Sequence, residues 1–194
     1  MDILSIALTL FLIMDPFGNI PVFMPILEKV PTERRRWVLV RELLLALAVI
    51  VSFIFGGRYV LSLLGLRPES ISIAGGIILF LIAVRMVFPT REGVGEVEIE
   101  GEPLLVPLAV PLIAGPSLLA VLLLLTIAEP RETFAILVAA ALAWLATFVV
   151  LLGSTLLMRL LTKRGLIAIE RLMGMILAAL AIQLLMDGVS NYLE

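Results

Sequence analysis

The sequence is dominated by six long apolar runs, each about as long as a membrane-spanning helix. They occupy residues 4–27, 38–64, 70–88, 104–128, 133–161 and 166–189. A helix needs about 20 apolar residues to cross the roughly 30 Å hydrocarbon core of a bilayer. Hydrophobic residues make up 62% of the chain, against about 45–50% in soluble domains. Because the runs lack the alternation of barrel strands, we predict an all-α membrane protein with six transmembrane helices.

The composition excludes several classes of function. The chain has no Cys and no His, so thiolate metal sites, thiol redox chemistry and Ser-His or Cys-His nucleophiles are excluded. We therefore predict no enzymatic activity, no catalytic residue, no metal site and no cofactor. A net charge of −2 without a basic tract gives no reason to expect a nucleic-acid partner. The expected partner is the lipid bilayer. Whether the protein also forms a homo-oligomer stays open.

Lysine and arginine are distributed unevenly between the two sides of the predicted bundle. Eleven of the fourteen lie in or beside the first, third and fifth connections: Lys29, Arg34, Arg35, Arg36, Arg41, Arg85, Arg91, Arg159, Lys163, Arg164 and Arg171. The other side holds Arg58, Arg67 and Arg131. Cytoplasmic loops carry the excess of positive charge. We therefore predict a multi-pass protein of the inner or plasma membrane with both termini outside.

The two halves of the sequence resemble each other. "ISIAGGIILFLIAVRMVF" in the third run aligns without gaps with "IERLMGMILAALAIQLLM" in the sixth, with five identities, and the first and fourth runs each contain an interior Gly/Pro break. This predicts two three-helix repeats, residues 1–90 and 104–194, joined by an acidic cytoplasmic linker, residues 91–103. Because three spans is an odd number, the second repeat must be inverted. Secondary transporters with this architecture bind substrate near the midplane.

The breaks in the first and fourth runs fall at matched depths. At 1.5 Å per residue, residues 4–14 and 104–115 cover about 16 and 18 Å, close to half of the membrane core. Pro16 and Pro116 each suit the first position of a new helix, and Asp15 suits the N-cap before it. We therefore predict that transmembrane helices one and four are broken at the midplane.

These breaks suggest a ligand. The free N–H groups at the start of both second halves would point to the centre and favour a carboxylate. The Asp15 carboxylate, or unwound carbonyl groups, would suit an ammonium group. Together, the N–H groups and the carboxylate would suit a zwitterion, so we predict a ligand such as an amino acid. An ionisable residue at the membrane centre also marks a functional site. The predicted substrate-binding residues are Asp15, Pro16, Phe17, Gly18, Asn19, Ala114, Gly115, Pro116, Ser117 and Gln183.

Three motifs, "DPFGNIPVF", "PLAVPLIAGP" and "ERLMGMILAALAIQ", together resemble the MarC family of six-span membrane proteins over nearly the whole chain. The resemblance implies paired broken helices and, from the SnatA-type members, transport of small neutral amino acids such as glycine and alanine. The family motifs fall on Asp15, Pro16, Gly18, Asn19 and Pro21, and on Ala114, Gly115 and Pro116. Family members usually continue the second motif with another Gly, whereas this chain has Ser117, which leaves the exact substrate open.

The sequence therefore predicts a secondary transporter of small neutral amino acids (glycine, alanine, serine) that works by alternating access. A drug efflux protein or a channel on the same scaffold is the alternative. An aspartyl protease that uses Asp15 and Asp187 is disfavoured, because the Gly-x-Gly-Asp signature is absent. The coupling ion (H⁺ or Na⁺) and the direction of transport stay open.

Overall fold

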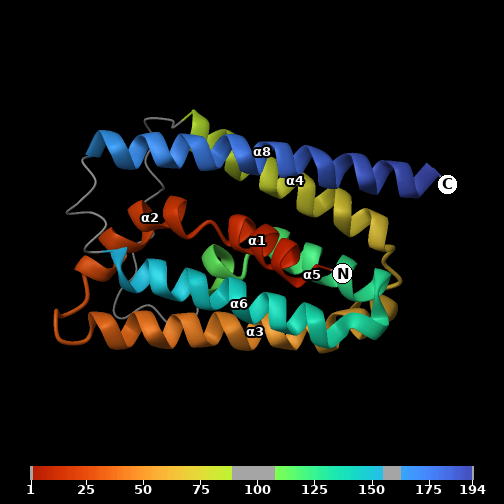
Figure 1. Cartoon of the computed structure of the whole chain (residues 1–194), viewed down its shortest axis with the longest axis horizontal. Coiled ribbons are helices and arrows are strands. Elements are labelled where there is room, and N and C mark those ends of the chain that lie inside the picture. The colour runs from red at the N-terminus through yellow and green to blue at the C-terminus, as the bar shows by residue number, and fades with distance from the viewer. Residues whose placement is uncertain (1, 89–107, 155–162, 194) are drawn as a thin grey trace.

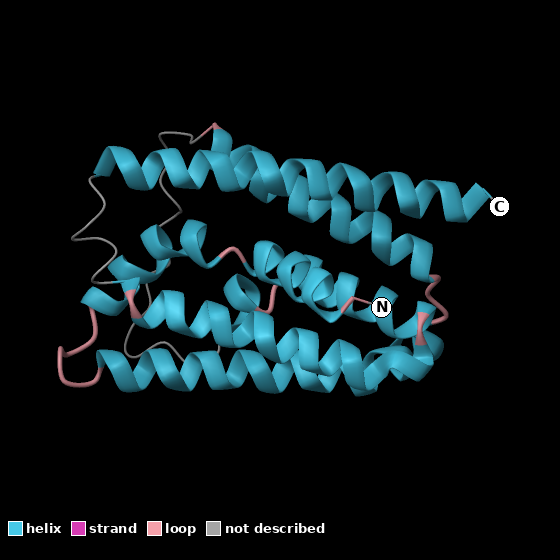
Figure 2. Ribbon diagram, viewed as in Figure 1, coloured by secondary structure: helices cyan, strands magenta, loops and turns pink. Residues whose placement is uncertain are grey.

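A computed structural model describes residues 2–88, 108–154 and 163–193. Throughout these ranges the regular structure is helical and contains no strand (Figure 2), which confirms the predicted all-α class. The elements are α1 (Ile3–Met14), α2 (Pro16–Glu28), α3 (Arg35–Leu64), α4 (Pro68–Val87), the π-helical η1 (Leu108–Ile113), α5 (Pro116–Ala128), the 3-10 helix η2 (Pro130–Glu132), α6 (Thr133–Leu152) and α8 (Lys163–Leu193).

Five helical segments are long and apolar enough to cross a membrane, namely Ile3–Ile20, Arg35–Leu64, Pro68–Val87, Pro130–Leu152 and Ile167–Leu193. A sixth apolar helix, α5, has 13 residues. The described helices match the predicted runs to within a few residues at most ends. The predicted linker 91–103, the first residues of the fourth run and the last residues of the fifth lie outside the described ranges.

Most of the helices run along one long axis of the molecule (Figure 1). The two termini, residues 65–67 and η2 lie toward the right-hand end in Figure 1, which we call the terminal end. The turn between α2 and α3 and the start of α8 lie at the left-hand end, which we call the opposite end. Placing both termini toward one end is what an even number of crossings requires.

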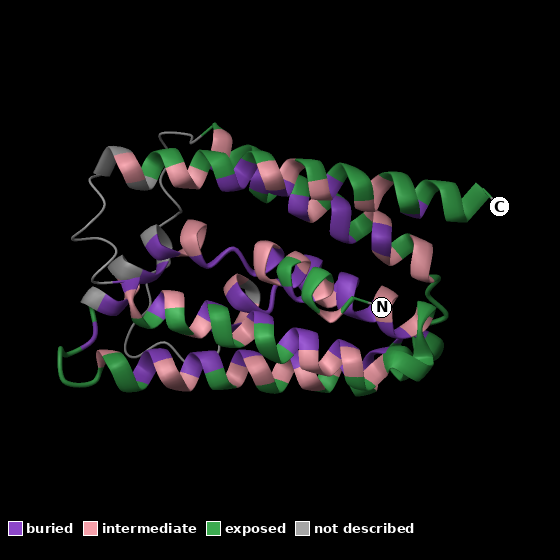
Figure 3. Ribbon diagram, viewed as in Figure 1, coloured by how far each residue is buried: buried purple, intermediate pink, exposed green. Residues whose placement is uncertain are grey.

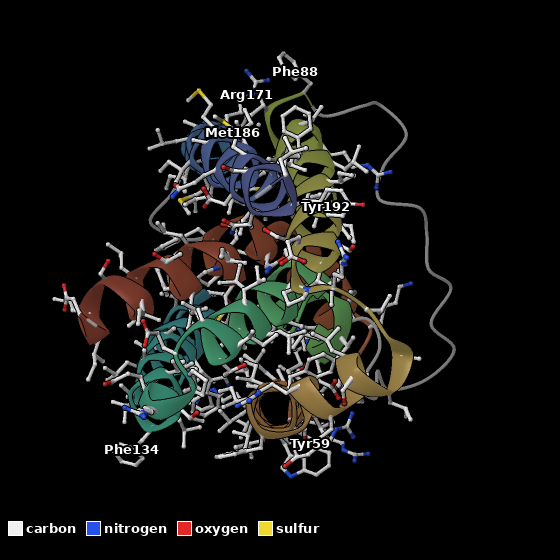
Figure 4. The ribbon with its side chains drawn as sticks, turned by 90° about the vertical axis from the view of Figure 1, so that its right-hand side faces the viewer. Tyr59, Phe88, Phe134, Arg171, Met186 and Tyr192 are labelled. Carbon is white, nitrogen blue, oxygen red and sulfur yellow. The ribbon has the colours of Figure 1, made fainter. Side chains whose placement is uncertain are left out.

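Apolar side chains fill the inside of the bundle and also cover much of its outside. Buried residues face the neighbouring helices, and exposed ones lie on the outer faces (Figure 3). Viewed from the terminal end, Tyr59, Phe88 and Phe134 point away from the bundle (Figure 4), and each is at least 70% exposed. Exposed aromatic side chains of this size fit a surface that lies against lipid rather than water.

One polar contact joins α3 to α6, and a polar cluster lies next to it on α3. The Trp144 indole N–H on α6 donates to the carbonyl of Leu43 at 2.8 Å. Next to it, Glu42 is completely buried and pairs with Arg41 at 2.9 Å. The Arg41 guanidinium also lies 5.0 Å from the centre of the Trp37 ring. A charge buried in an apolar bundle requires such partners, so this cluster has a structural explanation.

Helices α4 and α8 pack side by side along most of their lengths (Figure 1). A Cβ atom added to Gly76 would lie 3.0 Å from the carbonyl oxygen of Ala181, and one added to Gly174 would lie 3.0 Å from that of Ala83. At these positions the two backbones approach so closely that a side chain would have to displace one of them. Small residues at such positions are typical of membrane helix pairs.

Candidate functional site

The first junction, residues 14–18, lies between α1 and α2. Asp15 has φ 42° and ψ 61°, and is the one non-glycine residue with positive φ in the described ranges. Its N–H donates to the carbonyls of Phe11 and Leu12 at the end of α1. Its Oδ1 atom accepts from the N–H of Gly18 at 3.1 Å, which caps α2. A left-handed Asp costs on the order of 1–3 kcal/mol, and strain of this kind is concentrated at functional sites.

The second junction, residues 113–117, lies between η1 and α5. The π-helical turn ends at Ile113, and α5 begins at Pro116. Inside this turn Val110 is extended, with φ −130° and ψ 127°. Gly115 is also extended, with φ −74° and ψ 161°, and provides no side-chain cap for the helix that follows. Pro116 therefore begins α5, as the sequence predicts.

The two junctions differ in how the next helix is capped. In α5 the first backbone bond after the junction runs from the N–H of Leu119 to the carbonyl of Gly115 at 3.0 Å. The N–H groups of Ser117 and Leu118 come before this bond and have no carbonyl one turn earlier in the helix. At the start of α2, by contrast, Asp15 supplies its own cap. The expectation of free N–H groups at both junctions therefore holds better for α5.

Asn19 links the two junctions. Its side-chain amide donates to the carbonyl of Met14 at 2.9 Å and to the carbonyl of Leu112 at 3.2 Å. The second bond joins residues 93 positions apart. Thr147 on α6 is completely buried and donates to the sulfur of Met14 at 3.4 Å. Asn19 therefore ties the backbone at the end of α1 to the backbone just before the second junction, near the middle of the bundle (Figure 1).

Helix α4 closes the site on another side. A Cβ atom on Gly18 would overlap both the methyl group of Met86 and the Asp15 carboxylate. Gly75, which like Met86 belongs to α4, lies close to α5. A Cβ atom added to Gly75 would lie 3.8 Å from the Cα atom of Ser117. Asp15 and Ser117 are only 6% and 4% exposed. The site is therefore enclosed, and water is largely kept from it.

The site is electrostatically negative around Asp15. Glu170, on α8, adds a weak, longer-range repulsion to the Asp15 carboxylate. Among the described residues no cluster of three or more His, Cys, Asp or Glu is placed to hold a metal ion. A buried carboxylate in an apolar surrounding favours an organic cation, such as an ammonium group, beside it.

The structure joins the segments that carry most of the predicted site residues. Asn19, one residue beyond the first junction, bonds the carbonyl of Leu112, which comes just before the second junction with Ala114, Gly115 and Ser117. Phe17 is half-buried and packs edge-on against Phe11, with ring centres 6.2 Å apart. Pro116 is exposed.

Gln183 is the exception among the predicted residues. It is exposed on α8, whose buried face is formed by residues such as Leu177 and Ala181. Because two residues turn a helix by about 200°, Gln183 points away from that face. The structure does not bring it to the junctions.

Four residues beside the site were not identified from the sequence: Val110, Thr147, Met86 and Glu170. Val110 carried a usable signal, because it precedes Pro111 and a residue before Pro is biased toward extended geometry. The other three reach the site only through packing, and nothing in their own segments indicates it.

Replacing Asn19 by Ala is expected to destabilise the protein. The change removes the bond between the junctions and the local bond to Met14, and leaves two carbonyl groups without their donor, which costs about 1–3 kcal/mol for a buried group. We expect a lower melting temperature of the purified protein in detergent. The control is Asn191→Ala, at an exposed position on α8. Equal melting temperatures for the two variants would show that the Asn19 link contributes nothing.

The comparisons with known proteins agree with this architecture. The sequence matches the MarC family of integral membrane proteins over residues 1–193. It is 48% identical over 194 residues to the UPF0056 inner membrane protein YhgN of Escherichia coli K12, covering 100% of this chain and 98% of that protein. A UPF0056 membrane protein of Methanocaldococcus jannaschii is 33% identical over 193 residues, covering 95% and 94% of the two chains. No solved structure matches.

Proposed function

Since the chain belongs to the MarC family of integral membrane proteins and is a multi-pass inner membrane protein, we propose that it is a secondary transporter of small neutral amino acids, such as glycine, alanine and serine. One observation supports this most directly. A junction that carries a carboxylate and a junction whose helix start has no side-chain cap are linked by Asn19. This arrangement complements the two charges of a zwitterion.

The two junctions take different ends of the substrate. The Oδ1 atom of Asp15 caps Gly18, so the second carboxylate oxygen receives the ammonium group. The substrate carboxylate accepts from the N–H groups of Ser117 and Leu118, at the positive end of α5, and from the Ser117 hydroxyl. Because both places are buried, a ligand with only one of the two charges leaves a buried group without a partner. Selectivity for zwitterions follows from this.

Contacts between α4 and α8 support the inverted repeat. In the alignment of the third and sixth apolar runs, Gly76 corresponds to Gly174 and Ala83 to Ala181. Gly76 meets Ala181, and Gly174 meets Ala83, as in two copies related by a two-fold axis. The other helices exchange neighbours in the same way, since α1 and α2 pack on α6 whereas their counterparts η1 and α5 pack on α3. The junctions at Asp15 and Gly115 are then equivalent midplane breaks.

The charge distribution orients the protein. The terminal end carries Arg58, Arg67 and Arg131, and the sequence assigns the remaining eleven basic residues, of which Arg91 and Arg159 lie outside the described ranges, to the other side. By the positive-inside rule the terminal end is the outer face. Transport then proceeds by alternating access of the two repeats about the junctions, with H⁺ or Na⁺ as candidate coupling ions and no enzymatic step.

Uptake of labelled glycine and alanine into proteoliposomes tests the proposal, with and without an imposed pH or sodium gradient. The expected result is saturable uptake that unlabelled substrate competes away. Flux without saturation would indicate a channel, and activity with bulky apolar cations would indicate drug efflux. If well-folded protein takes up neither amino acid, the proposal fails.

A further inference from the structure

A cavity of about 370 Å³ opens between α4, α5 and α8 at the terminal end. Apolar residues of α5 form one wall, and Glu69 and Asp187 bring carboxylates to the lining. Next to this lining, the guanidinium of Arg67 lies 5.5 Å from the centre of the Tyr192 ring and joins the start of α4 to the end of α8. Figure 4 shows Tyr192 between these two helices, seen from the terminal end.

The cavity extends toward the second junction. Val121, in its wall, lies one helical turn (about 5.4 Å) from Ser117 on α5. Ser72, also in the lining, is only 4% exposed and donates to the carbonyl of Leu184 at 2.8 Å. Three residues further along α4, Gly75 contacts the backbone of Ser117. The deepest described lining residues are therefore one turn from the proposed binding site.

We propose that this cavity is the outer vestibule through which a small zwitterion reaches the second junction, and that the structure holds the vestibule open while Met86 and Leu27 are packed at the equivalent positions on the other side. This inference rests on the proposed function. The lining suits the ligand, because the carboxylates of Glu69 and Asp187 attract an ammonium group and the apolar wall lets it pass without binding it tightly.

The repeat gives each residue of the vestibule a counterpart on the other side of the midplane. The third and sixth runs align with an offset of 98 residues, and the two junctions align with an offset of 100 residues. The counterparts of Ser72, Leu184 and Ile127 are Glu170, Met86 and Leu27. Since the repeats are inverted, these counterparts mark the equivalent pathway from the opposite end of the bundle.

Two described counterparts of the vestibule lining are buried. Leu184 and Ile127 line the cavity and are half-buried, whereas their counterparts Met86 and Leu27 are only 8% and 6% exposed. The methyl group of Met86 occupies the space beside Gly18. At these two pairs the repeats therefore hold equivalent residues in different environments, one beside a cavity and the other buried, whereas in the third pair Ser72 is buried and Glu170 is half-buried.

Met86 lies directly beside the binding site. Gly18, which contacts Met86, donates its N–H to Asp15, and Asp15 is the residue that receives the ammonium group. Opening the inner pathway requires Met86 to leave Gly18, and Glu170 then lines that pathway as Ser72 lines the outer one. Gly18 thus contacts both Asp15, which binds the substrate, and Met86, the inner gate.

Cysteine accessibility tests the inference, because the chain has no Cys and each introduced thiol is the sole one. Leu184→Cys and Leu27→Cys are reconstituted in nanodiscs, where both faces are open to a charged, membrane-impermeant thiol reagent. Without substrate, we expect Leu184→Cys to react at least about tenfold faster than Leu27→Cys. Saturating glycine should slow the first reaction and speed the second by several-fold.

Two further variants keep the test decisive. Ile127→Cys is a second thiol in the vestibule, should Leu184→Cys fold poorly, and Ser70→Cys is an exposed control on α4 that should react at the same rate with and without glycine. Equal rates at the vestibule and at Leu27 overturn the inference, whatever the uptake assay shows. Unequal rates that glycine leaves unchanged also overturn it. The proposed function stands or falls separately, on uptake.

Discussion

Replacing Asp15 by Asn is expected to abolish amino acid uptake while the protein stays folded. Asn keeps a side-chain oxygen that can accept from the Gly18 N–H, and it tolerates the left-handed backbone at this position. What it lacks is the negative charge for the ammonium group. Removing one partner of a buried ion pair costs about 3–5 kcal/mol, so affinity should fall by at least roughly 100-fold. The initial rate of labelled glycine uptake measures the effect.

Two variants separate charge from capping at this position. Asp15→Ala loses both, so it should also lower the melting temperature, since an N-cap is worth about 0.5–2 kcal/mol. Asp2→Asn is the matched control, because Asp2 is likewise an N-cap, of α1, but is exposed. Asp2→Asn should transport normally. Full uptake by Asp15→Asn would remove this carboxylate from the binding site.

Replacing Gly18 by Ala should also abolish uptake, for a steric reason. The new methyl group would overlap the side chain of Met86 and the carboxylate of Asp15, so one of them must move. Overpacking of this kind costs about 1–3 kcal/mol, and the displaced group is either the ammonium ligand or the proposed gate. Glycine uptake and the melting temperature of the purified protein should both fall.

A glycine elsewhere in the chain provides the control. A Cβ atom at Gly56, inside α3, would have no neighbour within 4 Å, so Gly56→Ala should transport normally and be neutral or slightly more stable. Adding Met86→Ala to Gly18→Ala removes one of the two overlaps and should recover part of the lost stability. Normal uptake by Gly18→Ala would show that the first junction is not packed as described.

The sequence predicted those features that the bilayer and the local chain impose. Membrane thickness dictates the length of an apolar helix, so the long runs located α3, α4 and α8 closely. The starts of α2 and α5 followed from Pro16 and Pro116, because proline favours the first position of a helix. The role of Asp15 as a cap followed from the same local chemistry.

Other features depend on how distant segments pack, and local patterns do not contain them. Asn19 bonds the backbone of Leu112, and any residue type could supply that carbonyl. Gln183 was chosen by its place in the repeat, which gives its depth but not which way it faces. The spacing of the small residues Gly174, Ala181 and Gly188, seven apart, would have indicated the packed face of α8.

The close contact of α4 with α8 has a mechanical consequence. Gly76, Gly174 and Gly188 bring the two backbones together, and a Cβ atom at any of them would lie within about 3 Å of the neighbouring helix. Interlocked side chains resist sliding, because each ridge must leave its groove before the helices can shift. Glycines form no such ridge, so these two helices can undergo shear, a small translation along their shared direction. The pair can then stay in contact while the rest of each half rotates around it.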